Sequence, residues 1–167
     1  MKTNRKPKPG YWLVSLLVAV SCSLSANTVY LIRHAEKQPV GADPALTDCG
    51  IARAEALAQA MAGIKLAAIY TTAYQRTEQT AAIIASRQQL KLKQYDAREP
   101  QRLLQQLSAH AGPVLVVGHS NTVPDLVSRL STIPMAAIDE QDYAMLYQVT
   151  TGDNPSVTLS RQAFVCQ

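Results

Sequence analysis

Short apolar runs rich in β-branched residues alternate along this chain with longer stretches whose apolar residues recur at helical spacing. The apolar runs cover residues 28–32, 67–70 and 114–117, and a further extended piece covers 90–95. Apolar runs of this length are typical of buried strands. Strands that alternate with helices form mostly parallel sheets with helices on both faces. The sequence therefore predicts an α/β domain of three layers, in which a mostly parallel central sheet is flanked by helices.

Capping residues and chain breakers mark the expected helices. The stretch 51–61 has Thr47 as a natural N-cap and Gly63 as a natural stop. Three more helices are expected, one ending near residue 89, one over 102–110 and one ending near 130. Two strands around the turn 152–155 are expected over 143–149 and 157–161. They predict an antiparallel edge at the C-terminal end of the sheet.

The first 26 residues differ from the rest of the chain. A basic stretch, an apolar run over 11–20 and small residues up to Ala26 follow one another, which is the pattern of a secretory signal. The apolar run is too short to span a bilayer comfortably. We expect residues 1–26 to be a signal peptide and residues 27–167 to form one domain. The protein is expected to be exported, with the periplasm as its expected location.

Two points about the cysteines stay open. The segment 18–22 resembles a lipoprotein acylation box, so cleavage before Cys22 and attachment to a membrane through a lipid is an alternative. Cleavage after Ala26 leaves Cys49 and Cys166 as a pair in an oxidising compartment. The sequence does not place their Cα atoms at bridging distance, so a disulfide and two separate thiols remain equal alternatives.

The basic excess of the chain lies in its first eight residues. Residues 27–167 hold 12 basic and 12 acidic residues, so the net charge of +4 comes entirely from the expected signal. The isoelectric point near 9.1 therefore does not indicate a nucleic-acid partner.

Two of the three histidines directly follow apolar strands. His34 follows Arg33 at the end of the first strand, and His119 follows Gly118 at the end of the strand over 114–117. Arg76 follows the second strand, and reactive groups of parallel sheets collect at the carboxyl ends of the strands. Two arginine forks and two imidazoles suit a tetrahedral dianion, and a neutral imidazole can attack phosphorus. We expect His34 to be the nucleophile, with Arg33, Arg76 and His119 neutralising the phosphoryl oxygens.

Four ordered motifs carry a family resemblance. Leu31-Ile32-Arg33-His34-Ala35-Glu36 resembles the L-x-R-H-G/A-E signature of the histidine phosphatase superfamily, the phosphoglycerate mutase-like enzymes. The segments 46–50, 71–81 and 116–121 resemble, in order, that family's L-T/S-x-x-G helix entry, its S-S/T-x-x-x-R-x-x-Q-T-A segment and its second-histidine strand. The resemblance implies a phosphoglycerate mutase-like fold, His34 as phosphoacceptor, a phosphate pocket of Arg33, Arg76 and His119, and no metal or other cofactor.

The general acid is where the chain departs from the family pattern. Family members with such an acid usually carry it in an insertion after the third strand, and here that connection is only residues 95–100. Asp96 or Glu99 could protonate the leaving oxygen, and the alternative is that both are solvated loop charges. Asn121 is a candidate to donate to the phosphate, although capping of the following helix is the favoured interpretation. Glu36 is expected in a structural salt bridge.

The sequence also allows functions other than that of a phosphatase. Residues 118–122 approach a serine-hydrolase elbow, but they lack its last glycine and no histidine follows Ser120. A phosphate- or phosphosugar-binding protein without catalysis is the main alternative, and a mutase is disfavoured by export and by the missing insertion. The expected substrate is a small extracytoplasmic phosphosugar or a phosphorylated envelope component, with the heptose phosphates of lipopolysaccharide as an analogy.

Overall fold

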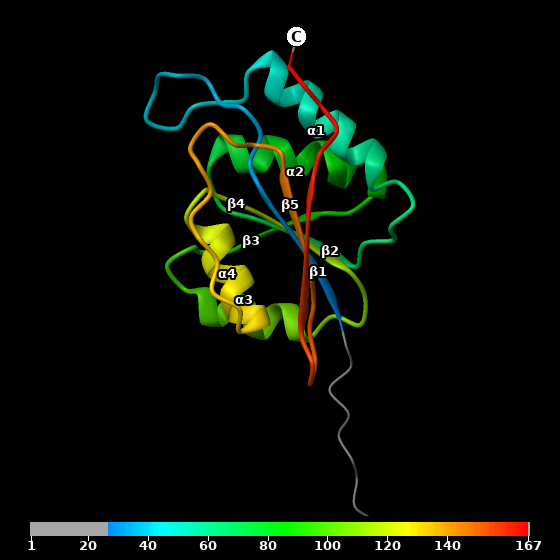
Figure 1. Ribbon diagram of the computed structural model, residues 1–167. Helices are drawn as coiled ribbons and strands as arrows, with labels where there is room; N and C mark the ends of the chain where they lie inside the picture. Colours follow the sequence, from blue (N-terminus) through cyan, green and yellow to red (C-terminus); the bar gives the residue numbers. More distant parts are fainter. Residues whose placement is uncertain (1–26, 167) are drawn as a thin grey trace, which may run out of the picture.

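Six strands and four helices build the part of the chain that the computed structural model describes, residues 27–166 (Figure 1). The strands are β1 Thr28–Arg33, β2 Ala68–Thr71, β3 Leu92–Gln94, β4 Val114–Gly118, β5 Met145–Thr150 and β6 Ser156–Arg161. The helices are α1 Asp48–Ala60, α2 Gln75–Gln88, α3 Pro100–Ser108 and α4 Thr122–Ser131. Each lies where the sequence predicts it, with ends shifted by a few residues. The expected signal peptide and the Cys22 alternative lie outside the described residues.

The sheet has the strand order β3-β2-β4-β1-β5-β6. Strands β1 to β4 are parallel to one another, whereas β5 and β6 are antiparallel to their neighbours. The predicted mostly parallel sheet with an antiparallel C-terminal edge is therefore confirmed. β1 and β4 are neighbours at its centre, with Arg33 opposite Gly118 in the register. This register brings the carboxyl ends of the two strands side by side.

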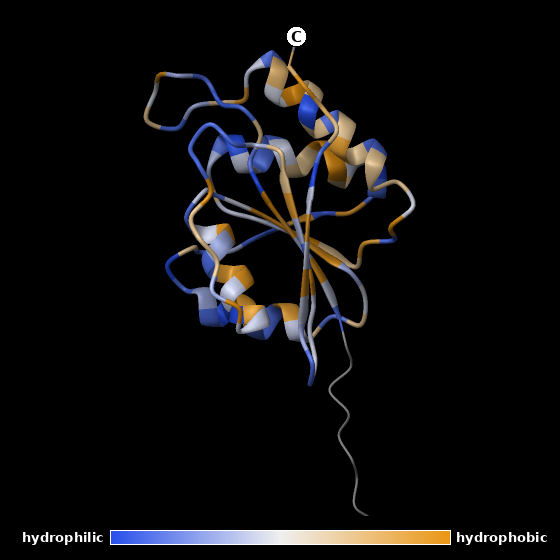
Figure 2. Cartoon of the chain, in the orientation of Figure 1, coloured by the Kyte–Doolittle hydropathy of each residue, from blue (hydrophilic) through white to orange (hydrophobic). Residues whose placement is uncertain are grey.

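Helices cover both faces of the sheet, with α1 and α2 on one face and α3 and α4 on the other (Figure 1). Successive residues of a strand point to opposite faces, so Leu31 packs in the core under α3 and α4 and Ile32 in the core under α1 and α2. The apolar colour of the central strands in Figure 2 agrees with this burial on both sides. The three-layer fold class is confirmed. Among residues 27–166, no helix is long and apolar enough to cross a membrane.

Local sequence signals set the helix ends. Thr47 is the N-cap of α1, and its Oγ1 accepts a hydrogen bond from the Gly50 amide at 3.1 Å, as expected. α3 begins with Pro100, whose missing amide hydrogen is not needed in a first helical turn. Gln89, the C-cap of α2, is in the left-handed conformation with φ of 55°.

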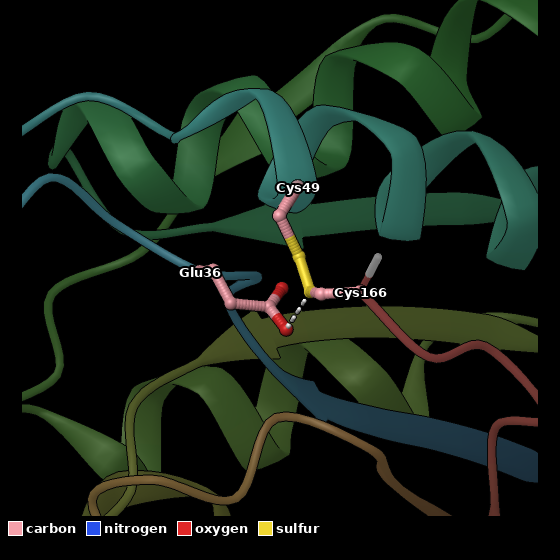
Figure 3. A group of neighbouring side chains, drawn as sticks. All are labelled: Glu36, Cys49 and Cys166. Atoms are coloured by element: carbon pink, nitrogen blue, oxygen red, sulfur yellow. Dashed lines mark hydrogen bonds between the residues drawn. A yellow bond between two sulfur atoms is a disulfide. The ribbon is translucent and has the colours of Figure 1, made fainter.

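A disulfide joins Cys49 at the start of α1 to Cys166 near the C-terminus, with the Cα atoms 5.6 Å apart (Figure 3). This settles the open question about the two thiols. Glu36 lies beside the bridge, with its Oε1 3.3 Å from Cys166 Sγ. The same carboxylate accepts hydrogen bonds from Arg53 Nε at 2.9 Å and Nη2 at 2.7 Å, so the expected structural salt bridge of Glu36 is confirmed. The C-terminal segment is thereby fastened to α1.

We predict that removing the disulfide destabilises the domain. The bridge spans 117 residues, and a link across a long loop lowers the entropy of the unfolded chain. The double variant Cys49→Ser/Cys166→Ser should lose about 2–4 kcal/mol of unfolding free energy, measured by urea denaturation. Wild type with reductant should match the variant, and equal stability of variant and oxidised wild type would contradict the prediction.

Candidate active site

The two histidines that follow strands meet at the carboxyl end of the sheet. His34 follows β1 and His119 follows β4, and their ring centroids are 5.6 Å apart in an edge-to-face arrangement. The His34 amide donates to the carbonyl of Gly118 at 2.9 Å, which continues the ladder between β1 and β4 by one residue. The parallel register alone therefore brings together two side chains that are 85 residues apart in the sequence.

His34 presents Nε2 as a free base. The residue is 2% exposed, and its Nδ1 lies 2.8 Å from the Ala35 carbonyl oxygen. A carbonyl only accepts, so Nδ1 carries the hydrogen and the lone pair stays on Nε2. Burial, with the positive charges of Arg33 and Arg76 in support, lowers the pKa of His34 to about 3. The imidazole is therefore neutral and nucleophilic at any ordinary pH.

The backbone amide of His119 is hydrogen-bonded, whereas Nε2 of its ring has no partner among the described residues. Its amide donates to Thr122 Oγ1 at 2.9 Å in the first turn of α4. The ring packs edge-on against Tyr74 with a centroid distance of 5.3 Å, and its Nε2 is buried without a hydrogen-bond partner among the described residues. Burial, then Arg76 and Arg33, lowers the pKa of His119 to about 4. A bound anion would raise this pKa and favour a donor at Nε2.

Arg33 is buried, and its fork holds the chain between α4 and β5. Nη1 donates to three carbonyl oxygens of that segment, at 2.9 Å to Asp139, 2.8 Å to Glu140 and 3.3 Å to Asp142. Nη2 donates to the Glu140 carboxylate at 2.8 Å. The guanidinium lies 4.2 Å above the ring centroid of Tyr143. Of the three guanidinium nitrogens of Arg33, Nε is the one that is buried and has no hydrogen-bond partner among the described residues.

Arg76 enters the site from the first turn of α2. Its Nη1 lies 3.5 Å from the Asp43 carboxylate, and its guanidinium stacks 4.5 Å from the ring centroid of Tyr74. Asp43 also accepts from the Gln75 amide at 3.0 Å, so it caps a helix whose own N-cap residue offers no side-chain bond. Arg76 Nε is buried and, within residues 27–166, unpartnered.

The sequence candidates thus separate into two sets. The structure brings His34, His119 and the two arginines together. Asp96 and Glu99 instead lie on the exposed connection before α3, where they pair with Arg98 at 2.6 Å and Arg102 at 3.3 Å. The hydrogen bond from Arg98 lowers the pKa of Asp96 to about 2. Neither carboxylate contacts any of the four pocket residues, and their role as acid stays a prediction.

The expectation that the Asn121 side chain caps α4 is wrong. It occupies the N-cap position of α4 but has helical φ and ψ, so its side chain makes no capping bond. The neighbouring Thr122 hydroxyl accepts the His119 amide instead. Asn121 is exposed beside the site, and its expected contact with phosphate stays a prediction.

Several residues around the site have no motif that marks them in the sequence. Asp43 and Glu140 lie in irregular segments, and each touches one of the two site arginines. Tyr74 and Tyr143 form the aromatic walls beside the two imidazoles, with Tyr143 5.9 Å from His34 between ring centroids. Only Tyr74 belongs to a segment with a recognised pattern.

A groove of about 630 Å³ adjoins the site across Tyr74. It runs between the segment 72–74, the end of β3 and the start of α3, and its lining includes Gln94, Arg98, Arg102 and Gln106. These side chains offer amide and guanidinium donors, and the two arginines are paired with carboxylates. The groove is therefore polar but nearly balanced in charge.

The arrangement can bind and attack a tetrahedral oxyanion. Among the described residues, three buried nitrogens of the residues beside His34 lack protein partners: Arg33 Nε, Arg76 Nε and His119 Nε2. Buried polar nitrogens of this kind are costly to leave unpaired, which points to a ligand as their partner, and the two arginine N–H groups require ligand oxygens. Elsewhere in residues 27–166, Glu36, Cys49 and Cys166 come together as groups of the metal-ligating type, but both sulfurs are used in the disulfide.

Gly118 is required at the junction of the two strands, and we predict that Gly118→Ala weakens anion binding. A Cβ there would lie 2.9 Å from Thr122 Oγ1 and 3.0 Å from Tyr95 Oη, so Thr122 must move from the His119 amide. The dissociation constant for orthophosphate, measured by calorimetry, should rise tenfold or more. Thermal unfolding should show a loss of about 1–3 kcal/mol from overpacking. Unchanged orthophosphate affinity in a folded variant would contradict the prediction.

Comparisons with known proteins agree with this geometry. The family model of the histidine phosphatase superfamily (branch 1) matches residues 29–99. That range contains Arg33, His34 and Arg76, three of the four residues that the structure brings together. No curated protein matches the chain in sequence.

Several solved structures share the fold. A structure described as mycobacterial hydrolase 2 has 15% identity and a TM-score of 0.70, with 85% of this chain and 94% of that chain covered. The protein histidine phosphatase SixA with tungstate has 20% identity and a TM-score of 0.67, with 81% and 97% covered. Mycobacterial glucosyl-3-phosphoglycerate phosphatase has 12% identity and a TM-score of 0.67, with 84% and 100% covered. The family match over residues 29–99 and the shared fold confirm the predicted resemblance to the histidine phosphatase superfamily and the predicted phosphoglycerate mutase-like fold.

Proposed function

We propose that the protein is a phosphomonoester hydrolase that acts through a covalent phosphohistidine on His34. One observation carries the proposal. His34 presents an unprotonated Nε2 at the end of β1, and among residues 27–166 a buried nitrogen of each of its neighbours Arg33, Arg76 and His119 lacks a protein partner. A phosphoryl group supplies acceptor oxygens for the two arginine N–H groups, favours a protonated His119 Nε2, and offers an electrophilic centre to the His34 base.

The reaction would proceed in two displacements. His34 Nε2 forms a bond to phosphorus while the bond from phosphorus to the ester oxygen breaks, and the departing oxygen takes up a proton from a protein acid or from water to give the alcohol. Water then attacks the phosphohistidine, its oxygen bonds to phosphorus, and the histidine leaves as the neutral base. Arg33, Arg76 and His119 stabilise the charge on the three equatorial oxygens in both steps. Because these side chains supply the positive charge, we expect turnover without a metal ion.

For the substrate, we propose a small extracytoplasmic phosphosugar or an envelope phosphate. The groove beside Tyr74 supports this choice, because its amide, guanidinium and carboxylate groups suit the hydroxyls of a sugar. By their names, one protein of similar fold is a protein histidine phosphatase and another is a glucosyl-3-phosphoglycerate phosphatase. The similar folds therefore accompany phosphorylated substrates of different size.

A second candidate function is the binding of phosphate or a phosphosugar without catalysis. It is favoured by the occupied fork of Arg33, whose terminal nitrogens already hold three carbonyls and the Glu140 carboxylate. Because both terminal nitrogens of Arg33 are hydrogen-bonded to the protein, only its Nε is available to a bound phosphate. Turnover distinguishes the two functions.

We further propose that the protein is exported with residues 1–26 removed. The basic, apolar and small-residue order of this segment supports the proposal, as does the Cys49–Cys166 disulfide, because disulfides persist mainly in oxidising compartments.

The mass of the chain recovered from the periplasmic fraction should correspond to a start at Asn27. A lipid-modified chain that starts at Cys22 would support the membrane-anchored alternative, and an unprocessed cytosolic chain would contradict export.

We predict that the mature protein hydrolyses an aryl phosphate in the presence of a chelator and that His34→Ala lowers kcat by about a thousandfold or more, because the nucleophile is lost. Wild type should also yield an acid-labile, base-stable phosphoenzyme that the variant lacks. His110→Ala is the matched control, because His110 bonds to Tyr70 at 3.1 Å and its carbonyl accepts from Asn27, before the amino end of β1. Full turnover by His34→Ala would contradict the mechanism, and a folded wild type without turnover or adduct would support the binding protein.

A further inference from the structure

The carboxylate of Glu140 touches both sides of the pocket. Its Oε1 accepts a hydrogen bond from Ser120 Oγ at 2.5 Å, and Ser120 directly follows His119. Its Oε2 accepts from Arg33 Nη2 at 2.8 Å, and Arg33 directly precedes His34. The Glu140 carboxylate therefore binds both Arg33, the residue before His34, and Ser120, the residue after His119.

Buried contacts fix the backbone beneath this carboxylate. Arg33 Nη1 binds the carbonyls of Asp139, Glu140 and Asp142, so the turn is wrapped around a buried cation. Just before the turn, Ile138 is buried, and its amide donates to the Ser120 carbonyl at 3.1 Å. Figure 1 shows this segment passing from α4 towards the α1 and α2 layer before it enters β5. The Glu140 backbone is held in place, whereas 71% of its side chain is exposed and can exchange protons with water.

We propose that Glu140 is the general acid of the proposed phosphatase reaction. This inference rests on the proposed function. The carboxylic acid proton moves to the ester oxygen as the bond from phosphorus to that oxygen breaks, which leaves the carboxylate and a neutral alcohol. In the second step the carboxylate takes a proton from the attacking water as the bond from oxygen to phosphorus forms, so the acid is restored.

The charges around Glu140 change when substrate binds. In the free protein, the hydrogen bond from Ser120 and then the charge of Arg33 lower the pKa of Glu140. A phosphate dianion at Arg33 would cancel this positive charge and repel the carboxylate, so the pKa would rise. The flanking Asp142 is engaged with Arg161 at 2.7 Å, and Asp139 accepts from the Gln141 amide. Substrate binding itself would thus favour the protonated form that an acid needs.

The other carboxylates near the site are less suited to the role. Asp43 uses its oxygens for the Gln75 amide and Arg76, where it caps α2. Asp96 and Glu99 pair with Arg98 and Arg102 along the groove and contact none of the pocket side chains. Glu140 therefore combines contact with the pocket and access to solvent.

The test uses substrates that differ in their need for an acid. We expect Glu140→Gln to lower kcat/KM about a hundredfold for an alkyl phosphate such as glycerol phosphate, because a strongly basic leaving oxygen must be protonated. For nitrophenyl phosphate, whose leaving group departs as an anion, the loss should stay within about threefold. Glu55→Gln, an exposed glutamate on α1, is the matched control and should change neither value. For wild type, kcat with the alkyl phosphate should fall at high pH, and this limb should be absent in Glu140→Gln.

Three results would overturn the proposal. Equal losses on both substrates would show that Glu140 only positions Arg33. A loss that depends on the leaving group in Asp96→Asn or Glu99→Gln, but not in Glu140→Gln, would move the acid to the groove. Wild type without turnover of nitrophenyl phosphate and without a phosphoenzyme would remove both the proposed function and its acid. Formation of phosphoenzyme from nitrophenyl phosphate by Glu140→Gln shows that the variant is folded, so a loss confined to alkyl phosphates supports the proposal.

Discussion

The parallel pairing of β1 with β4 is the constraint on which the site depends. Both strands lie in the middle of the sheet, and their apolar residues pack between helix layers on both faces, so the register cannot slip without moving every side chain to the wrong face. The pairing ends with Arg33 opposite Gly118, and the His34 amide adds one more bond to the Gly118 carbonyl. The two imidazoles are therefore positioned by the most buried part of the fold and not by loops.

Arg33 connects this rigid centre to the irregular chain between α4 and β5. A buried guanidinium without partners is costly, and the cost is offset here by carbonyl oxygens and by the Glu140 carboxylate. The turn 139–142 has no regular secondary structure of its own, so these bonds to Arg33 are what give it a defined position. The same cation thus shapes the wall of the pocket and lends positive charge to its interior.

The sequence predicted what depends on local pattern and failed where tertiary contacts decide. Apolar runs located the strands, and the residues just after them located His34, His119 and Arg76. Glu140 and Asp43 could not be found in this way, because each lies in an irregular segment and takes its place from an arginine that is distant in the sequence. The capping interpretation of Asn121 was wrong, since its backbone is already helical and Thr122 bonds to the His119 amide. The disulfide likewise depends on a Cα distance that spacing in the sequence does not determine.

The two arginines of the site are each paired with a carboxylate in the free protein, Arg33 with Glu140 and Arg76 with Asp43. Such pairs prevent an unpaired buried cation, whose desolvation would destabilise the fold. A phosphate dianion must compete with these carboxylates, so part of its attraction to the arginines is spent on weakening existing pairs. The net favourable binding free energy of a phosphate group would therefore be smaller than two unpaired arginines would give, both for a substrate and for inorganic phosphate. The three nitrogens that are unpartnered among the described residues face no such competition, so in the proposed reaction their interactions with phosphoryl oxygens would be the ones most able to favour the transition state.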